Sequence, residues 1–197
     1  PTKHFVQALR KRCSETGTLL ILDEIQCGFG RTGKMFAFEH FNIEPDILLL
    51  AKGMGGGMPI GAFISSKSMM SCLSKDPILG HITTFGGHPV SCAAGLACLT
   101  VIQEERLIES VKSKELLFRK LLISPEIQEI RGVGLMLAIQ LRSSEKLFSV
   151  IDKCINNGIV TDWFLFCDTA MRIAPPLTIS EKEIEEACTI INQSLIE

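Results

Sequence analysis

The first residues of the chain carry apolar side chains at helical spacing. Phe5, Leu9 and Cys13 recur every four residues with mostly polar positions between them, and Gly17 follows. This spacing places the three side chains on one face of a helix, and glycine is common just past a helix end. The pattern therefore predicts an amphipathic helix over residues 3–15.

Continuous apolar runs replace this spacing further along the chain. One run covers residues 18–22 and a second covers residues 47–51, and each gives way abruptly to a charged residue. Such runs after a helix are typical of buried parallel strands. A third strand is expected at 60–64, beyond a glycine-rich stretch that could be only a floppy loop. Residues 1–85 therefore predict an α/β fold.

From residue 89 the pattern becomes that of a compact α+β unit. The predicted helices cover 89–105, a stretch ending near 122, 144–156 and the C-terminal residues, where Ser180 and Glu183 form a capping box. The predicted short strands cover 127–131, 135–141, 159–161 and 171–173. We expect two domains, an incomplete sheet domain over 1–100 and a small α+β domain over 101–197.

Composition and charge narrow the classes of protein. The chain has 20 Lys and Arg against 22 Asp and Glu, a net charge of −2 that argues against a polyanion-binding protein. With 46% hydrophobic residues it can bury a substantial core. No apolar run is long enough for a membrane span, and the start lacks the pattern of a signal peptide, so neither is expected.

The cysteines indicate thiols rather than a disulfide framework or a metal site. All 8 are scattered along the sequence, with no CxxC pair and no histidine cluster beside them. Scattered cysteines of this kind are typical of reduced thiols in the cytosol. We therefore expect a cytoplasmic protein without a bound metal.

Two nucleotide-binding patterns overlap at residues 28–34, where GFGRTGK spells both GxGxxG and GxxxxGK. A phosphate-binding P-loop needs Ser or Thr after its lysine, and Met35 stands there. A dinucleotide fingerprint needs its glycines directly after the strand, whereas residues 23–27 intervene. We therefore expect neither pattern to bind a nucleotide.

Asp23 and Lys52 follow two predicted strands at their carboxyl ends. Ligands of open α/β sheets bind beyond these strand ends, so that an acid and an amine would face one crevice if the strands are neighbours. A surface salt bridge at the rim of the sheet is the alternative on charge pattern alone.

The residues around this pair resemble a known family at several separated places. LDEIQCGFGRTGK at 22–34, PDI at 45–47, AKG at 51–53, TTFGGHP at 83–89 and MRIAPPL at 171–177 closely resemble the class-III aminotransferases of the ornithine and acetylornithine type. These enzymes use pyridoxal 5'-phosphate (PLP). The resemblance implies the fold of a fold-type I PLP-dependent transferase, here part of the large domain plus the C-terminal small domain.

The resemblance also implies roles for residues in the first half of the chain. Lys52 matches the lysine that forms the Schiff base with PLP and then moves the substrate proton, which needs an unprotonated amine. Asp23 matches the carboxylate that keeps the pyridine nitrogen protonated. Ile25 matches the apolar residue against the ring, and Gln26 matches the amide near the ring hydroxyl. Core packing and a polar loop position are the alternatives for these last two.

Three further matches concern phosphate and carboxylate groups. Thr84 matches the threonine that contacts the PLP phosphate of the neighbouring subunit, which implies a homodimer with shared active sites. Thr83 stands where the family commonly has Ser and keeps the hydroxyl, whereas His88 stands where Asn is common. Arg172 matches the arginine that holds the substrate α-carboxylate, and an exposed strand arginine is the alternative.

Family members are about twice as long as this chain, and their N-terminal half has no counterpart here. We therefore expect the C-terminal part of an enzyme that needs its N-terminal half, and little or no activity from the chain alone. The implied reaction moves an amino group from ornithine, acetylornithine, 4-aminobutyrate or a lysine-like donor to a 2-oxo acid such as 2-oxoglutarate. The alternatives are another PLP reaction, such as that of an aminomutase, racemase or decarboxylase, and a silent interaction protein.

Overall fold

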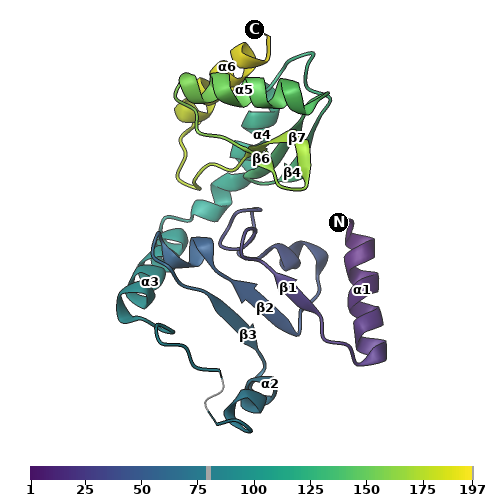
Figure 1. The fold of residues 1–197 in the computed structure, drawn as a ribbon, viewed down its shortest axis with the longest axis vertical. Helices are drawn as coiled ribbons and strands as arrows, with labels where there is room; N and C mark the ends of the chain where they lie inside the picture. The colour runs from purple at the N-terminus through teal and green to yellow at the C-terminus, as the bar shows by residue number, and fades with distance from the viewer. Residues whose placement is uncertain (79–80, 197) are drawn as a thin grey trace. The chain divides into compact units, whose positions relative to one another are not determined.

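The computed structural model describes residues 1–78 and 81–196 (Figure 1). The chain forms two compact units, unit 1 over Pro1–Arg106 and unit 2 over Leu107–Glu197. The expected division at residue 100 lies inside helix α3 (Pro89–Glu104), a few residues before the boundary between the units.

Unit 1 contains a three-stranded sheet in the order β1-β2-β3. β1 (Ile21–Asp23) runs parallel to β2 (Ile47–Leu50), which confirms the parallel arrangement predicted for the two apolar runs. β3 (Ala62–Ser65) is antiparallel to β2. The expected burial holds for only part of the sheet, because Ile21 is 52% exposed where the described residues provide no cover.

Helix α1 (Lys3–Thr16) precedes β1, as the apolar spacing predicts. Thr2 caps its first turn, and Gly17 ends it in the left-handed region at φ 68°, a conformation that glycine adopts without steric cost. Arg10 on this helix forms an ion pair of 2.6 Å with Asp46, whose carboxylate also accepts the Leu20 backbone N–H at 2.7 Å. These contacts hold the pKa of Asp46 below its usual range and tie α1 to the strands.

The remaining elements of unit 1 are short, apart from α3. They are the 3-10 helices η1 (Ala37–Phe41), η2 (Lys52–Gly55) and η3 (Ser71–Ser74), and the helix α2 (Lys67–Met70). α1 packs beside η1, and α3 packs beside η2.

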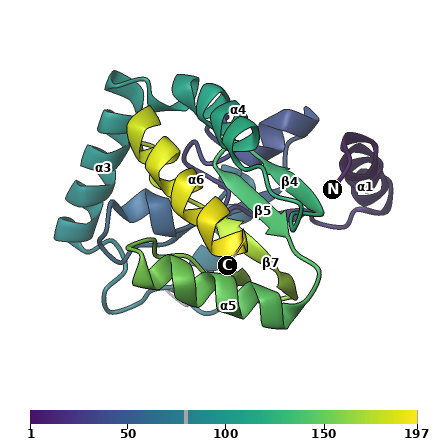
Figure 2. The same ribbon diagram turned by 90° about the horizontal axis from the view of Figure 1, so that it is seen from above.

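Unit 2 is a two-layer α+β structure that begins with the 3-10 helix η4 (Leu107–Ser110). Its antiparallel sheet has the order β4-β5-β7-β6, formed by β4 (Glu129–Val133), β5 (Met136–Gln140), β6 (Trp163–Phe164) and β7 (Cys167–Ile173). Helices α4 (Val111–Leu121), α5 (Ser144–Asn156) and α6 (Glu181–Ile196) pack together against it (Figure 2). Ser180 and Glu183 form the predicted capping box at the start of α6.

The hydrophobic core of unit 2 lies between this sheet and its helices. Residues from every helix and from the central strands are almost fully buried in it, among them Phe118, Leu137, Leu147, Met171 and Ile191. The apolar positions predicted for the helix at 144–156 supply four of the core residues, which are Leu147, Val150, Ile151 and Cys154. The period of this helix was therefore readable from the sequence.

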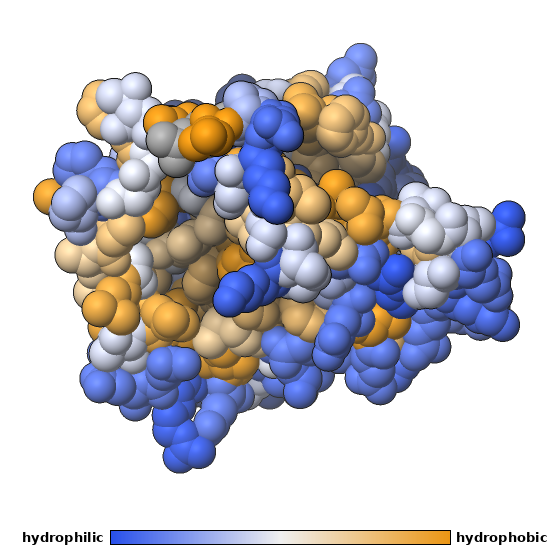
Figure 3. Space-filling model, turned by 90° about the horizontal axis from the view of Figure 1, so that it is seen from below, coloured by the Kyte–Doolittle hydropathy of each residue, from blue (hydrophilic) through white to orange (hydrophobic). Residues whose placement is uncertain are grey.

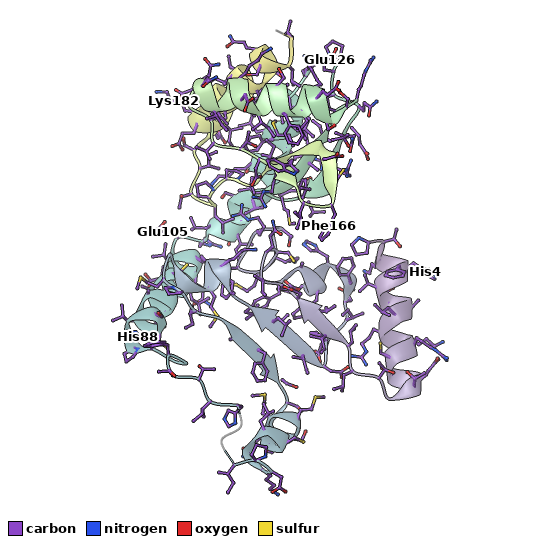
Figure 4. All side chains as sticks on the ribbon, in the orientation of Figure 1. His4, His88, Glu105, Glu126, Phe166 and Lys182 are labelled. Carbon is purple, nitrogen blue, oxygen red and sulfur yellow. The ribbon has the colours of Figure 1, made fainter. Side chains whose placement is uncertain are left out.

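One strand of unit 2 differs from the prediction. Residues 159–161 form no strand, and Val160 is 95% exposed. The strand lies instead at β6, two residues later, where it forms a hairpin with β7 (Figure 4). Leu165 and Phe166 at the turn are 83% and 97% exposed, so apolar side chains occupy a hairpin tip where a turn would normally be polar.

The structure also bears on the cysteines, metals and membranes. All eight cysteines are free thiols, as expected. Within residues 1–78 and 81–196, no group of three or more His, Cys, Asp or Glu side chains lies close enough to hold a metal ion. No helix in this part of the chain has the length and apolar character that crossing a membrane requires.

Candidate functional site

Asp23 and Lys52 lie at the same edge of the sheet of unit 1. β1 and β2 are parallel neighbours, with Asp23 opposite Leu49, and the Glu24 N–H donates to the Leu49 carbonyl at 3.0 Å. Asp23 is the last residue of β1, and Lys52 begins η2 just beyond β2. The predicted meeting of an acid and an amine at the carboxyl ends of two strands therefore has its structural basis.

Lys52 presents an unpaired amine from an unusual backbone position. Its φ of 44° lies in the left-handed region. This conformation is energetically unfavourable for any residue other than glycine, and residues that adopt it are common at functional sites. The side chain is exposed, and its Nζ forms no hydrogen bond or ion pair with any described residue. The alternative of a surface salt bridge to Asp23 is not realised.

Asp23 has one engaged and one open carboxylate oxygen. Its Oδ1 accepts the Ile25 N–H at 2.9 Å, and Oδ2 has no donor among the residues that the structure describes. The charges of Asp23 and Lys52 both affect the pKa of the Cys27 thiol. Burial and the charges of Glu24 and Asp23 raise the pKa of Cys27, while the charge of Lys52 opposes this rise.

Glu24 fixes the loop that follows Asp23. Its side chain is only 3% exposed, and its carboxylate accepts the N–H groups of Ala37 at 2.6 Å and Phe38 at 2.7 Å. Its carbonyl also accepts the Gly28 N–H at 3.0 Å. No short motif in the sequence indicates this role of Glu24, because its partners lie 13 and 14 residues away.

This loop also accounts for the glycines of the two nucleotide-binding patterns. Residues 25–32 form successive turns, without the helix start that either pattern requires. A Cβ on Gly28 would lie 2.9 Å from the Glu24 carbonyl oxygen, so this glycine permits a close turn. Phe29 packs with its Cβ against Gly53, directly after Lys52. The glycines therefore shape the loop beside the candidate site.

Part of the glycine-rich stretch after Lys52 packs closely against helix α3. A Cβ on Gly56 would lie 3.0 Å from the Cβ of Cys98, and one on Gly95 would lie 2.9 Å from the Met54 carbonyl oxygen. The Cys98 thiol also donates to the Gly53 carbonyl at 3.2 Å. Helix α3 therefore supports η2, and with it the backbone that carries Lys52.

A second feature of unit 1 is a pocket of about 320 Å³ at the start of α3. Thr83, His88 and Ser91 line it together with Pro59, Ile60, Gly61, Phe85, Gly86 and Gly87. Ser91 is buried, and no side chain caps the helix, which begins directly after the N-cap residue His88 labelled in Figure 4. Uncapped N–H groups and hydroxyls are suited to an anion such as a phosphate.

The other expected cofactor residues are placed less decisively. Thr84 is exposed and is not among the residues that line this pocket. Ile25 is partly buried, and Gln26 is exposed in the loop after β1. Both residues follow Asp23 closely in the sequence, but neither side chain makes a contact with the described residues that would identify its role.

Arg172 belongs to unit 2, where it lies on β7 opposite Ala138 of β5. Its guanidinium forms a short ion pair with Asp162, a partner that the sequence analysis did not identify. Helix α4 contacts the segment that follows Arg172, because the Lys114 ammonium of this helix donates to the Leu177 carbonyl at 2.5 Å. Burial lowers the pKa of Lys114, while the nearby Glu181 and Glu183 charges oppose this effect.

The sequence places the protein in a family. The family model described as "Aminotransferase class-III" matches residues 1–195. The chain belongs to the class-III aminotransferases. An acetylornithine aminotransferase of Haemophilus ducreyi is 38% identical over 193 residues, which cover 98% of this chain and 48% of that protein. A putrescine aminotransferase of Pectobacterium atrosepticum is 40% identical over 195 residues, 93% of this chain and 40% of that protein.

Solved structures of aminotransferases have the same fold. An ornithine aminotransferase from Toxoplasma gondii, with PLP at partial occupancy in its active site, matches 100% of this chain at a TM-score of 0.89 and 35% identity. An aminotransferase from Bacillus anthracis matches 98% of it at a TM-score of 0.91 and 31% identity. The expected fold class is confirmed. The present chain spans about half the length of these relatives, since it covers 47% and 48% of the two solved chains.

Class-III aminotransferases use PLP, and the chemistry of the residues in unit 1 fits this cofactor. Lys52 offers a primary amine without a partner, and Asp23 offers a carboxylate oxygen without a donor. The pocket at the start of α3 offers hydroxyls and helix N–H groups, the donors that a phosphate requires. The residues present could therefore serve the aldehyde, the pyridine nitrogen and the phosphate of PLP.

Proposed function

We propose that this chain is the lysine-bearing C-terminal part of a PLP-dependent aminotransferase. The enzyme moves an amino group from an amino acid or ω-amino acid to a 2-oxo acid such as 2-oxoglutarate. The observation that carries the proposal is the unpaired Lys52 amine just beyond β2, at the same edge of the sheet as Asp23 at the end of the parallel strand β1.

When PLP is bound, its chemistry is that of an aldehyde that joins amines and a ring that accepts electrons. Lys52 supplies the amine that holds the cofactor and, once released by a substrate amine, moves the proton between the substrate Cα and the cofactor carbon. Asp23 holds a proton on the pyridine nitrogen, which favours electron acceptance by the ring. Its open Oδ2 is the oxygen available for this role.

Further residues hold and orient the cofactor and the substrate. We assign Thr83 and Thr84, with the N–H groups at the start of α3, to a cofactor phosphate, which for Thr84 is that of the neighbouring subunit. We assign Ile25 to the apolar side of the ring site and Gln26 to the surroundings of the ring hydroxyl. Arg172 holds the substrate α-carboxylate, for which its planar fork of donors is suited.

The active enzyme needs more than this chain. Unit 1 exposes large apolar side chains on its sheet and on α3, and Figure 3 shows such residues gathered around a hollow on one face. We assign the cover to the N-terminal half of the enzyme and to a second copy, with Thr84 reaching the neighbouring active site. These partners explain why we expect little or no activity from the chain alone.

Covalent labelling tests the role of Lys52 without requiring activity. The chain is incubated with PLP and reduced with borohydride, which converts a reversible carbonyl–amine linkage into a stable secondary amine. We expect mass spectrometry of peptides to locate the label mainly on Lys52, and we expect Lys52→Ala to abolish it.

The exposed Lys67 provides the matched control. Lys67→Ala should leave the label on Lys52 unchanged. The proposal fails if the exposed lysines are labelled equally at every PLP concentration, in the chain and in the enzyme assembled from both halves.

A further inference from the structure

Arg172 is held by a second segment of unit 2 through its backbone as well as its side chain. Its N–H donates to the Asp162 carbonyl at 2.8 Å, and the Thr161 hydroxyl donates to the Arg172 carbonyl at 2.8 Å. These bonds continue the pairing of β6 with β7 beyond Trp163. Asp162 is therefore fixed directly across from Arg172, and the ion pair follows from this register.

Trp163 anchors the segment that carries Asp162. Its ring packs edge-to-face on Phe148 of α5, with ring centroids 5.1 Å apart. The pairing is irregular at Trp163 and Phe164, where the strand register shifts. Such irregularities commonly re-aim a side chain next to a functional position. The Asp162 carboxylate is thus held by a strand pairing and by an aromatic contact to a helix.

The ion pair engages only one end of the guanidinium. Asp162 accepts from Nη2, whereas Nε and Nη1 have no acceptor within the part of the chain that the structure describes. The Arg172 side chain is 33% exposed and that of Asp162 is 45% exposed, so both groups remain accessible to a small ligand.

The number of hydrogens on Nη2 determines what remains available for a ligand. Nη2 carries two hydrogens, one aligned with a hydrogen of Nη1 and the other with that of Nε. A carboxylate can bind two parallel donors at either of these forks. When Asp162 takes one hydrogen of Nη2, only one bidentate fork is left, and the plane of the guanidinium is fixed.

We propose that Asp162 is a positioning residue for Arg172, which holds the guanidinium so that a single fork receives the α-carboxylate of the substrate. The inference rests on the proposed function, because it concerns the carboxylate that Arg172 is assigned to bind. Asp162 does so as a hydrogen-bond acceptor, so that an uncharged acceptor of the same shape should replace it.

The first test follows the guanidinium of Arg172 in the chain itself. Nitrogen-15 NMR resolves the two Nη signals when rotation about the Nε–Cζ bond is slow and averages them when rotation is fast. We expect resolved signals in the wild type and in Asp162→Asn, and averaged signals in Asp162→Ala. Asp168→Ala, which removes an exposed aspartate of the same strand, should leave the signals resolved.

The second test measures the binding of 2-oxoglutarate as a carboxylate probe to the holoenzyme that contains this chain. We expect Asp162→Ala to raise the dissociation constant about tenfold, an effect typical of losing a hydrogen bond to a charged group. Asp162→Asn should restore binding to within about threefold of the wild type. PLP labelling of Lys52 should be unchanged in both variants.

Arg172→Lys separates this inference from the proposed function. If this variant leaves 2-oxoglutarate binding unchanged, the role assigned to Arg172 is wrong. If it weakens binding while Asp162→Ala does not, Arg172 keeps its role and the inference about Asp162 is overturned. Tighter binding in Asp162→Ala would also overturn it, because Asp162 would then compete with the ligand.

Discussion

Unit 2 encloses most of its large apolar side chains, whereas unit 1 leaves many of its own in solvent. In unit 2 the sheet and three helices enclose a core in which Leu137, Ile139 and Met171 have no exposed surface. In unit 1 the strand residues Ile21, Phe63 and Ile64 are 52%, 45% and 51% exposed. Strands this apolar normally have cover on both faces.

This difference in apolar burial indicates which unit has a complete core by itself. A closed core fixes side chains such as Arg172 on a stable sheet, and unit 2 has the sheet and helices to do so alone. Unit 1 carries Lys52 and Asp23 on a sheet that is open on part of its surface. Contiguous apolar surface of this kind marks an interface, which here agrees with a chain spanning 48% of a relative's length.

The largest expected effect comes from the core of unit 2. Leu137→Ala should lower the free energy of unfolding by about 2–5 kcal/mol, because the fully buried leucine leaves a cavity. Trp163 is the only tryptophan of the chain and lies in unit 2, so its fluorescence during urea unfolding reports on this unit.

Phe63 provides the corresponding substitution in unit 1. Phe63→Ala should cost less than about 1 kcal/mol, measured by hydrogen exchange of the β2 amides, because the side chain is already 45% exposed. A loss as large as that of Leu137→Ala would show that unit 1 has a closed core, and the comparison would fail.

Most secondary-structure elements of the two units could be predicted from the sequence. The helix at 3–15, the capping box of Ser180 and Glu183 and the apolar period at 144–156 depend on neighbours within a few residues. The parallel pairing of the first two strands was also predicted, because continuous apolar runs carry that signal. Local patterns thus gave most elements of both units.

Contacts between distant segments could not be predicted in this way. Glu24 binds N–H groups 13 and 14 residues away, and Asp162 meets Arg172 only because a hairpin aligns them. The first strand of this hairpin was predicted at 159–161, too early in the chain, since Leu165 and Phe166 are apolar but lie at the exposed tip. Pairing register and close packing around glycines depend on the folded chain, and composition alone does not encode them.

A smaller effect should come from a buried carboxylate. Among the described residues each unit buries one glutamate, Glu24 in unit 1 and Glu115 in unit 2. Glu115 accepts from Lys112 and from the Gly134 N–H at 3.0 Å each, and from Arg119 at 2.9 Å. Burial by itself raises the pKa of Glu115, but these hydrogen bonds outweigh burial and hold the pKa below its usual range.

The sign of the pH dependence follows from this lowered pKa. Glu115 stabilises the fold fully above its unfolded-state pKa of about 4.3, and the stabilisation is lost as the pH falls through the lower pKa of the folded state. Glu115→Gln should therefore cost about 1–3 kcal/mol at neutral pH and less at about pH 3, measured by urea unfolding with Trp163 fluorescence.

Glu129 is the matched control, since its side chain is 62% exposed and, within the described part of the chain, its carboxylate forms a single ion pair, with the Arg131 guanidinium at 3.6 Å. Glu129→Gln should change stability by less than about 0.5 kcal/mol at either pH. A cost of Glu115→Gln that stays constant between neutral and acidic pH would contradict the linkage.

The smallest expected effect concerns the packing of η2, which carries Lys52, against helix α3 in unit 1. Gly95→Ala improves helix propensity by about 1 kcal/mol, but its Cβ would lie 2.9 Å from the Met54 carbonyl oxygen, which must move. These effects oppose each other, so global stability should change by less than about 1 kcal/mol. The amides of residues 53–57 should nevertheless exchange faster, and PLP labelling of Lys52 should fall.

Ala97→Gly on the same helix separates packing from helix propensity. It should destabilise α3 by about 0.5–1 kcal/mol yet leave exchange at residues 53–57 and the labelling of Lys52 unchanged. If the two variants weaken labelling equally, Lys52 depends on the general stability of α3. If only Gly95→Ala does so, the close approach of η2 to the helix sets the position of Lys52, and unit 1 is ordered at its site even where its sheet is open.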